Sequence, residues 1–165
     1  MTILRSLRPK TDRAVTTALY LLDTNVFREM GTGGSAQVHT WLNTINDDQI
    51  RVSPVVYREM REGCERELRK RKERHTDLAV VEAALALLDQ FEMDYADRQI
   101  PITLAIEREL TKLLGAKAKN ERDMTLAATA IVHGLVIVTR NVKDFKGRGV
   151  RVLNPFKKAT KIEIV

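Results

Sequence analysis

The chain is poor in several residue types, and each shortage argues against a class of protein. Cys64 is its single cysteine, so no disulfide can form within the chain, which suits a reducing cytoplasm. The three histidines are scattered and lack the spacing of metal ligands, which argues against a zinc site. Aromatic residues make up 5% of the 165 residues, too few to predict a platform on which nucleic-acid bases stack.

Long apolar runs are also missing. Glu82 and Asp89 interrupt the best candidate for a membrane-spanning helix. Residues 1–18 carry several basic side chains and no continuous apolar core, so they do not resemble a secretory signal. The glycine-rich loop at residues 31–35 lacks the Gly-Lys-Ser/Thr ending of a nucleotide-binding P-loop, and we interpret it as a hinge or helix cap. We therefore expect a cytoplasmic protein without a membrane segment.

The residues that are present favour one globular domain. Apolar residues make up 44% of the chain, enough for one sizeable core at this length. The formal net charge is +6. A basic surface is what an enzyme acting on a polyanion would carry, but a basic protein without that role fits the charge equally well.

The order of apolar runs and helical stretches predicts the fold class. Ser53 and Pro54 mark a helix start, because a capping hydroxyl precedes a proline at the first helical position. A further helix is expected from near Pro101, and Asp123 opens a helix of small residues that Gly134 ends. The candidate strands are residues 19–22, 49–52, 135–139 and 151–153. Short strands separated by helices predict a three-layer α/β domain with a mainly parallel sheet.

Acidic and amide side chains occur at the ends of these strands and on one helix face. Asp23 directly follows an apolar strand, and ligands of open parallel sheets bind at the carboxyl ends of strands. Glu59 falls on the apolar face of its helix, so it needs a partner. Asp123 begins a helix whose alanines permit close packing on the sheet, and Asn141 and Asp144 follow the clearest strand.

Each of these positions also has a simpler interpretation. Asp23 and Asp123 could cap helices, Glu59 could pair with an arginine, and Asn141 could form a turn with its own backbone. Their joint placement is harder to explain, because crowded carboxylates near apolar surface cost stability unless a cation or proton compensates them. Asp, Glu and Asn oxygens are hard ligands that suit Mg²⁺ or Mn²⁺. Such ions can activate a water and stabilise the leaving oxygen of a phosphodiester.

At this point the sequence resembles PIN-domain ribonucleases, in particular the VapC-like toxins of type II toxin–antitoxin modules. The resemblance rests on Tyr-Leu-Leu-Asp-Thr-Asn-Val at residues 20–26, on residues 53–59, and on residues 123–145 with Ala-Ala-Thr-Ala and Val-Thr-Arg-Asn-Val-Lys-Asp-Phe. It covers most of the chain, from residue 20 to about residue 155. The implied organisation is a basic N-terminal extension at 1–18, a PIN domain at 19–155 and a basic C-terminal tail at 156–165.

The resemblance implies a PIN-like three-layer α/β/α fold and a Mg²⁺- or Mn²⁺-dependent endoribonuclease that cleaves RNA with a metal-activated water. It also implies a homodimer and a cognate VapB-like antitoxin. Asp23 and Asp123 match the family's core metal ligands, and Glu59 matches its second acid. Asn141 stands where some members have Asp, so either it or Asp144 could fill the fourth position. The remaining catalytic candidate is Thr139, which matches a family hydroxyl.

Basic residues and rival functions complete the sequence interpretation. Five basic residues after the last acidic motifs could hold RNA phosphates: Arg140, Lys143, Lys146, Arg148 and Arg151. The charged stretch at residues 66–74 could contact RNA, hold the antitoxin or simply face solvent. A phosphatase of the haloacid dehalogenase type needs a second Asp two residues after the first, and here that residue is Asn25. A non-catalytic PIN-like domain that binds RNA or protein is the main alternative.

Overall fold

The computed structural model describes residues 18–31, 33–115 and 120–165, and the predicted N-terminal extension lies outside them except for Ala18. In these ranges the chain forms a five-stranded sheet in the order β2-β1-β3-β4-β5. All neighbours are parallel except β4 and β5, which are antiparallel. The strands are β1 (Tyr20–Leu22), β2 (Ile50–Arg51), β3 (Val136–Val138), β4 (Arg151–Leu153) and β5 (Ile162–Ile164).

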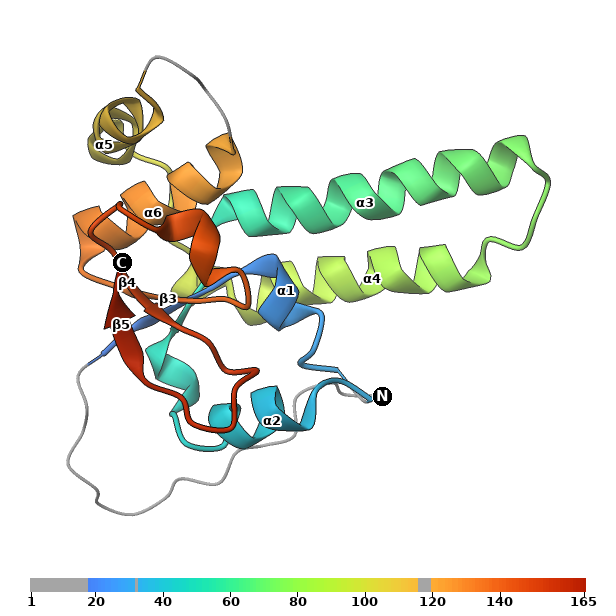
Figure 1. The fold of residues 1–165 in the computed structure, drawn as a ribbon. Helices are drawn as coiled ribbons and strands as arrows, with labels where there is room; N and C mark the ends of the chain where they lie inside the picture. Colours follow the sequence, from blue (N-terminus) through green and yellow to red (C-terminus); the bar gives the residue numbers. More distant parts are fainter. Residues whose placement is uncertain (1–17, 32, 116–119) are drawn as a thin grey trace.

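Helices lie on both sides of this sheet (Figure 1), which confirms the predicted three-layer α/β/α fold. The helices are α1 (Thr24–Phe27), α2 (Ala36–Leu42), α3 (Pro54–Glu73), α4 (Ala79–Asp94), α5 (Leu104–Leu114) and α6 (Glu121–His133). Short 3₁₀ turns are η1 (Asp47–Gln49), η2 (Ala96–Arg98) and η3 (Val142–Phe145).

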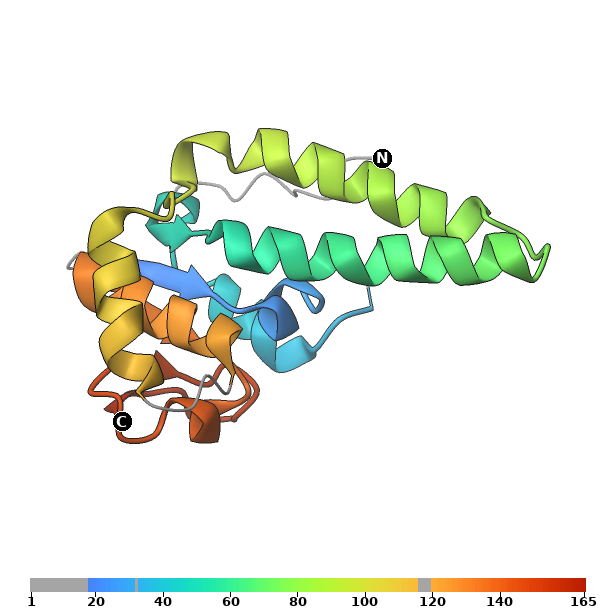
Figure 2. The same ribbon diagram turned by 90° about the horizontal axis from the view of Figure 1, so that it is seen from above.

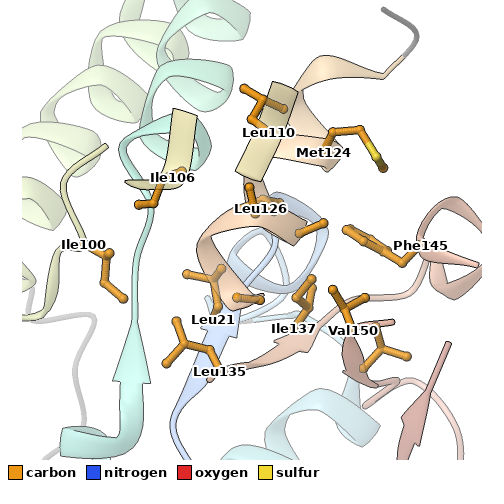
Figure 3. Packing of buried hydrophobic residues seen from close by; sticks show 14 of the residues in the cluster. Leu21, Ile100, Ile106, Leu110, Met124, Leu126, Leu135, Ile137, Phe145 and Val150 are labelled. Carbon is orange, nitrogen blue, oxygen red and sulfur yellow. The ribbon is translucent and has the colours of Figure 1, made fainter. Parts of the chain in front are cut away.

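Alternation along β1 divides the core into two parts. Leu21 points into a cluster with residues of α5, α6 and η3, which Figure 3 shows from close by. Tyr20 and Leu22 point into the opposite cluster, where the rings of Tyr20 and Trp41 meet edge to face at 5.4 Å. Successive strand residues face opposite sides of a sheet, so a short strand that is buried along its whole length must be covered on both faces.

Helices α3 and α4 form a hairpin that projects beyond the sheet (Figures 1 and 2). The Ser53 hydroxyl accepts a hydrogen bond from Val55 N, with Pro54 at the first helical position, as the sequence predicts. Arg61 on α3 pairs with Asp89 on α4 at 2.5 Å. None of the helices in the described ranges combines the length and apolar composition needed to cross a membrane.

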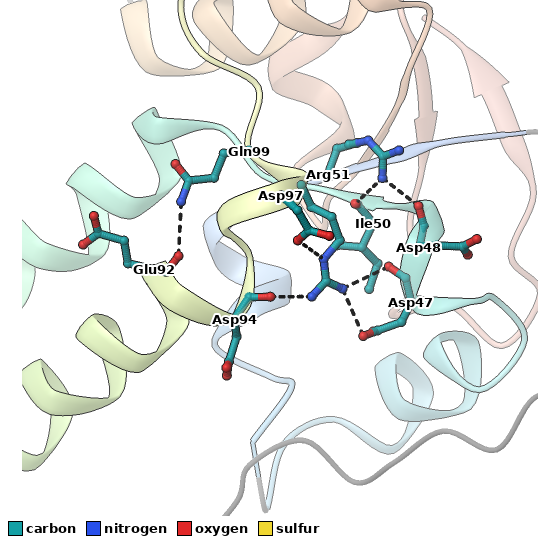
Figure 4. Close-up of polar contacts among 9 residues, drawn as sticks. Asp47, Asp48, Ile50, Arg51, Glu92, Asp94, Asp97 and Gln99 are labelled. Carbon is teal, nitrogen blue, oxygen red and sulfur yellow. Dashed lines mark hydrogen bonds and ion pairs between the residues drawn. The ribbon is translucent and has the colours of Figure 1, made fainter.

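Arg98 forms a polar network at the base of this hairpin with Asp47, Asp94 and Asp97, the three acidic residues that Figure 4 labels around it. The Arg98 guanidinium donates to the Asp47 carboxylate at 3.0 Å and to the Asp94 carbonyl at 2.5 Å. On the main chain, Val52 N donates to Arg98 O and Ile100 N donates to Val52 O, at 3.1 and 2.8 Å. Both ends of the hairpin are therefore tied to β2, which fixes the first turns of α3 relative to the sheet.

Three details differ from the sequence interpretation. Helix α6 begins at Glu121 and has Asn120 at its N-cap, so Asp123 lies inside the first turn. Helix α5 begins at Leu104, three residues after Pro101, because the Thr103 hydroxyl caps it. Strand β5 lies within the segment interpreted as a basic tail, 156–165. Its isoleucines are exposed, so it has no core-directed alternation that would reveal a strand.

Candidate functional site

The carboxyl ends of β1 and β3 lie side by side, and the residue after each strand is buried and polar. Asp23 follows β1 and Thr139 follows β3, with 7% and 0% of their surfaces exposed. Asp23 N donates to Val138 O at 3.0 Å, which continues the pairing of the two strands. The Thr139 hydroxyl donates to Asp23 Oδ2 at 2.6 Å. Strand pairing thus places this hydroxyl against this carboxylate.

Asp23 caps α1 and also lies at the centre of the site. Its Oδ1 accepts from Thr24 N at 2.7 Å, so the capping interpretation is correct. Its Oδ2 accepts from Thr139 and from Asn25 Nδ2, the latter at 2.5 Å. Burial raises the pKa of Asp23, and the charge of Glu59 raises it further, while the three hydrogen bonds oppose this effect. The carboxylate is therefore held in a fixed orientation but at an electrostatic cost.

Glu59 reaches the same edge from α3. Its Oε2 accepts a hydrogen bond from the Thr24 hydroxyl at 2.7 Å. The partner that the sequence analysis required is thus a neutral hydroxyl from the residue after Asp23. Because a hydroxyl does not neutralise a carboxylate, the charge of Glu59 acts on its acidic neighbours, Asp23 among them.

Asp123 enters the site from the first turn of α6. Partial burial raises its pKa to about 6, and the charges of Asp23, Asp144 and Glu59 contribute in that order, with Arg122 opposing them. The N-cap of α6 is Asn120, so the capping interpretation of Asp123 is wrong. The fold therefore brings four carboxylates close enough for their charges to interact, from the end of β1 and from α3, α6 and η3.

The two candidates for the fourth acidic position are placed differently. Asn141 is exposed, and it contacts the site through its backbone: its N–H donates to the Thr139 hydroxyl at 2.9 Å, and its carbonyl accepts from Asp144 N at 3.0 Å. Asp144 is half-buried in η3, and its charge raises the pKa of Asp123. Asp144 is therefore the candidate whose carboxylate acts on the other acids.

Asn25 is a site residue that the sequence analysis overlooked. Its Nδ2 donates to Asp23 Oδ2 and to the Thr139 hydroxyl, at 2.5 and 3.1 Å. Its Oδ1 accepts from Arg140 N at 3.0 Å. One side chain thus joins the ends of β1 and β3. Its place two residues after Asp23 was the available signal, but partners more than a hundred residues away cannot be read from a local motif.

Comparison with known proteins identifies the family. The family model for the PIN domain matches residues 20–148, most of the chain. The chain belongs to the PIN domain family. The similarity to VapC-like proteins expected from the sequence is also confirmed. The VapC ribonuclease Y4jK of Sinorhizobium fredii (strain NBRC 101917 / NGR234) is 25% identical over 146 residues, which cover 86% of this chain and all of that protein.

Solved structures share the fold of this PIN domain at lower identity. FitAcB from Neisseria gonorrhoeae matches with a TM-score of 0.59 and 23% identity, covering 84% of this chain and 99% of the matched chain. VapBC-1 from nontypeable Haemophilus influenzae matches with a TM-score of 0.61 and 17% identity, covering 84% and 99%.

The side chains at the edge of this PIN domain have the donor chemistry that suits a divalent cation. Carboxylates supply its charged donors, a set that suits Mg²⁺ or Mn²⁺ better than zinc. The pKa values of Asp23 and Asp123 are raised by burial and by the charges of neighbouring acids, and the charge of a bound cation would lower them. Within the described ranges, no three or more Asp, Glu, His or Cys side chains lie close enough together to hold a metal ion. The acids thus lie within electrostatic range of one another in an open arrangement.

The raised pKa of Asp123, caused by burial and by the charges of the other acids, predicts a pH-dependent stability. The folded pKa of Asp123 is about 6 against 3.8 for an ordinary Asp, so the folded state binds the proton more tightly. Stability should therefore fall as pH rises from about 4 to about 6, and the penalty should persist above that range. In EDTA near neutral pH, Asp123→Asn should raise Tm by about 2–6 °C, from about 1–2 kcal/mol once solvent screening is allowed for.

Thermal melts of wild type and variant in EDTA across this pH range test the prediction. The matched control is Asp48→Asn, which removes an exposed carboxylate in η1. Below about pH 4 the wild type and Asp123→Asn should converge. A lower Tm for Asp123→Asn near neutral pH would instead show that Asp123 mainly stabilises the first turn of α6, an effect of about 0.3–1 kcal/mol.

Proposed function

We propose that this PIN domain is a divalent-metal-dependent endoribonuclease that acts as the toxin of a toxin–antitoxin pair. The observation that carries the proposal is the convergence of four carboxylates, from Asp23, Glu59, Asp123 and Asp144, at the carboxyl edge of a parallel sheet. Y4jK, to which this chain is similar, is named a VapC ribonuclease, and this supports RNA as the substrate. The net charge of +6 suits a polyanionic substrate.

Each side chain has a role in this proposal. Asp23, Glu59, Asp123 and Asp144 would hold Mg²⁺ or Mn²⁺, which when bound would activate a water and stabilise the leaving oxygen. Thr139 donates a hydrogen bond to Asp23, and Asn25 donates hydrogen bonds to both Asp23 and Thr139. These two residues therefore fix the orientation of the Asp23 carboxylate. Thr24 holds Glu59 in the same way. Asn141 presents only its backbone to Thr139, so we assign it to positioning.

The proposal includes partners. Solved structures with the same fold include a toxin–antitoxin complex from Klebsiella pneumoniae, with a TM-score of 0.55. By analogy we propose that a cognate VapB-like antitoxin binds this chain, that the chain forms a homodimer, and that it cuts RNA in the cytoplasm. Contacts with the RNA backbone carry no sequence information, so they do not determine which RNA is cut.

The proposal is tested with purified, antitoxin-free protein and total bacterial RNA. Reactions contain Mg²⁺ or Mn²⁺, or EDTA in their place. Discrete fragments that require the metal are expected, and mapping their ends would name the target. A folded protein that binds metal and RNA but leaves every RNA intact would overturn the nuclease and favour the alternative, a non-catalytic PIN-like binding domain.

Replacing Asn25 should weaken both the fold and the proposed activity. Asn25→Ala removes the donor shared by Asp23 and Thr139 and the acceptor for Arg140 N. We expect a loss of about 1–3 kcal/mol in the free energy of unfolding, because polar partners are left unsatisfied. Cleavage should fall about 10- to 100-fold, the usual effect of removing a group that orients a metal ligand.

Denaturant unfolding and RNA cleavage are measured on the same preparations. Asn43→Ala is the matched control, since Asn43 is exposed and follows α2 away from the site. Cleavage by Asn25→Ala within about twofold of wild type would show that Asp23 keeps its orientation without Asn25.

A further inference from the structure

Arg140 lies at the rim of the site, and among the described residues its guanidinium has no ion-pair partner. Its guanidinium lies over the ring of Phe156, with Cζ 5.0 Å from the ring centroid. Arg140 is exposed, and within the described ranges its guanidinium donates no hydrogen bond. A guanidinium that stacks through its face keeps the N–H donors on its edge available. The ring therefore orients Arg140 without using its hydrogen-bonding capacity.

The main chain of Arg140 is held from two sides. Its N–H donates to Asn25 Oδ1 at 3.0 Å, and Asn25 in turn donates to the Asp23 carboxylate. Its carbonyl accepts from Asn154 Nδ2 at 3.3 Å, while Asn154 Oδ1 accepts from Phe156 N at 3.0 Å. Asn154 thus fixes the position of Phe156 relative to Arg140. Two hydrogen bonds in series connect the Arg140 backbone to the central acid of the site.

The other arginines predicted to hold phosphates are engaged elsewhere. Arg148 donates to Leu113 O at 3.0 Å. Arg151 donates to Gly134 O, and it begins β4, opposite Val136. The acids lie at the carboxyl ends of the parallel strands, so Arg151 is at the wrong end of the sheet. Of the three predicted arginines, Arg140 alone borders the site and has a guanidinium without a hydrogen-bond partner in the part of the chain that the structure describes.

Two lysines from the C-terminal segment lie next to Asn154. A small cavity beside β4 is lined by Val142, Asn154, Lys157 and Lys161, with Ala159 and Glu163 completing the rim. Lys161 lies 4.0 Å from Glu163, at the limit of an exposed ion pair, and Lys157 is exposed. Surface pairs of this kind are weak and exchange readily for other partners. The C-terminal segment, which the sequence analysis interpreted as a basic tail, therefore continues the positively charged rim of the site beyond Arg140.

We propose that Arg140, stacked on Phe156, forms with Lys157 and Lys161 a subsite for the RNA phosphates that flank the one being cut. This inference rests on the proposed ribonuclease function and names where the rest of the substrate lies. The subsite reads the backbone and not the bases. Its occupation displaces counterions, so each phosphate contact adds about 0.7 to the magnitude of the slope of log K against log salt for a single strand.

The test measures binding of a labelled single-stranded RNA of mixed sequence to the full-length protein in EDTA, over a range of salt concentrations. Arg140→Gln should weaken binding about tenfold and lower the slope by about 0.7. The double variant Lys157→Gln, Lys161→Gln should lower the magnitude of this slope by about 1.4. The matched control is Arg151→Gln, which removes the same charge at the other end of the sheet and should bind within about twofold of wild type.

The outcomes separate this inference from the nuclease proposal. Weaker binding by Arg140→Gln, with Arg151→Gln unchanged, supports the subsite even if the wild type cuts no RNA in metal. Equal losses of RNA affinity in Arg140→Gln and Arg151→Gln would overturn the proposed subsite, because the net charge alone would then explain the binding. Wild-type cleavage in metal together with unchanged binding by Arg140→Gln would overturn the subsite and leave the nuclease standing.

Discussion

Asp123→Asn should abolish RNA cleavage while the protein stays folded. Asp123 is the carboxylate on which the other three acids act, and partial burial together with their charges raises its pKa to about 6. An amide keeps the shape and one oxygen but lacks the charge that would bind a divalent ion. Loss of such a ligand removes several kcal/mol of stabilisation of the developing charge. Since about 1.4 kcal/mol is tenfold in rate, we expect cleavage to fall about 10³-fold or more.

The measurement compares initial rates for wild type, Asp123→Asn and Asp48→Asn on one RNA in Mn²⁺. Asp48 is exposed in η1, so its variant controls for the loss of one negative charge. Circular dichroism and the thermal melt confirm that each variant is folded. Cleavage by Asp123→Asn at the wild-type rate would show that Asp123 is not part of the proposed metal site, and the central argument for catalysis would fall with it.

Phe145→Ala should cause the largest loss of stability. Phe145 is fully buried between η3 and α6, in the cluster that contains Met124 and Ile137 (Figure 3). Truncating a buried phenylalanine costs about 3–5 kcal/mol, from lost transfer free energy and from the cavity that remains. Asp144 precedes Phe145 in η3, so loosening this turn should also displace the fourth carboxylate.

Denaturant unfolding of Phe145→Ala and Phe145→Leu measures this effect. The leucine variant keeps most of the apolar volume and should lose clearly less stability than the alanine variant. A loss below about 1 kcal/mol for alanine would mean that η3 packs loosely on α6. In that case the position of Asp144 would need another explanation.

Much of the architecture followed from local patterns. Ser53 and Pro54 mark the start of α3, Gly134 ends α6 in a left-handed conformation at φ 64°, and the apolar runs coincide with β1, β2, β3 and β4. These signals are readable because capping, glycine geometry and burial act within a few residues. They also placed Asp23 after a strand and Glu59 on an inward helix face, which was enough to predict that acids would meet.

Only the tertiary structure decided how the acids are held and which residues accompany them. The hydrogen bond from Thr24 to Glu59 spans 35 positions, and that from Thr139 to Asp23 spans 116. No local rule contains such pairs, so the role of Asn25 stayed hidden. The same reason applies to Phe156 under Arg140. The sequence by itself predicted which acidic residues would meet, whereas the pairing of distant strand ends decided their hydrogen-bond partners, because those contacts exist only after the sheet has formed.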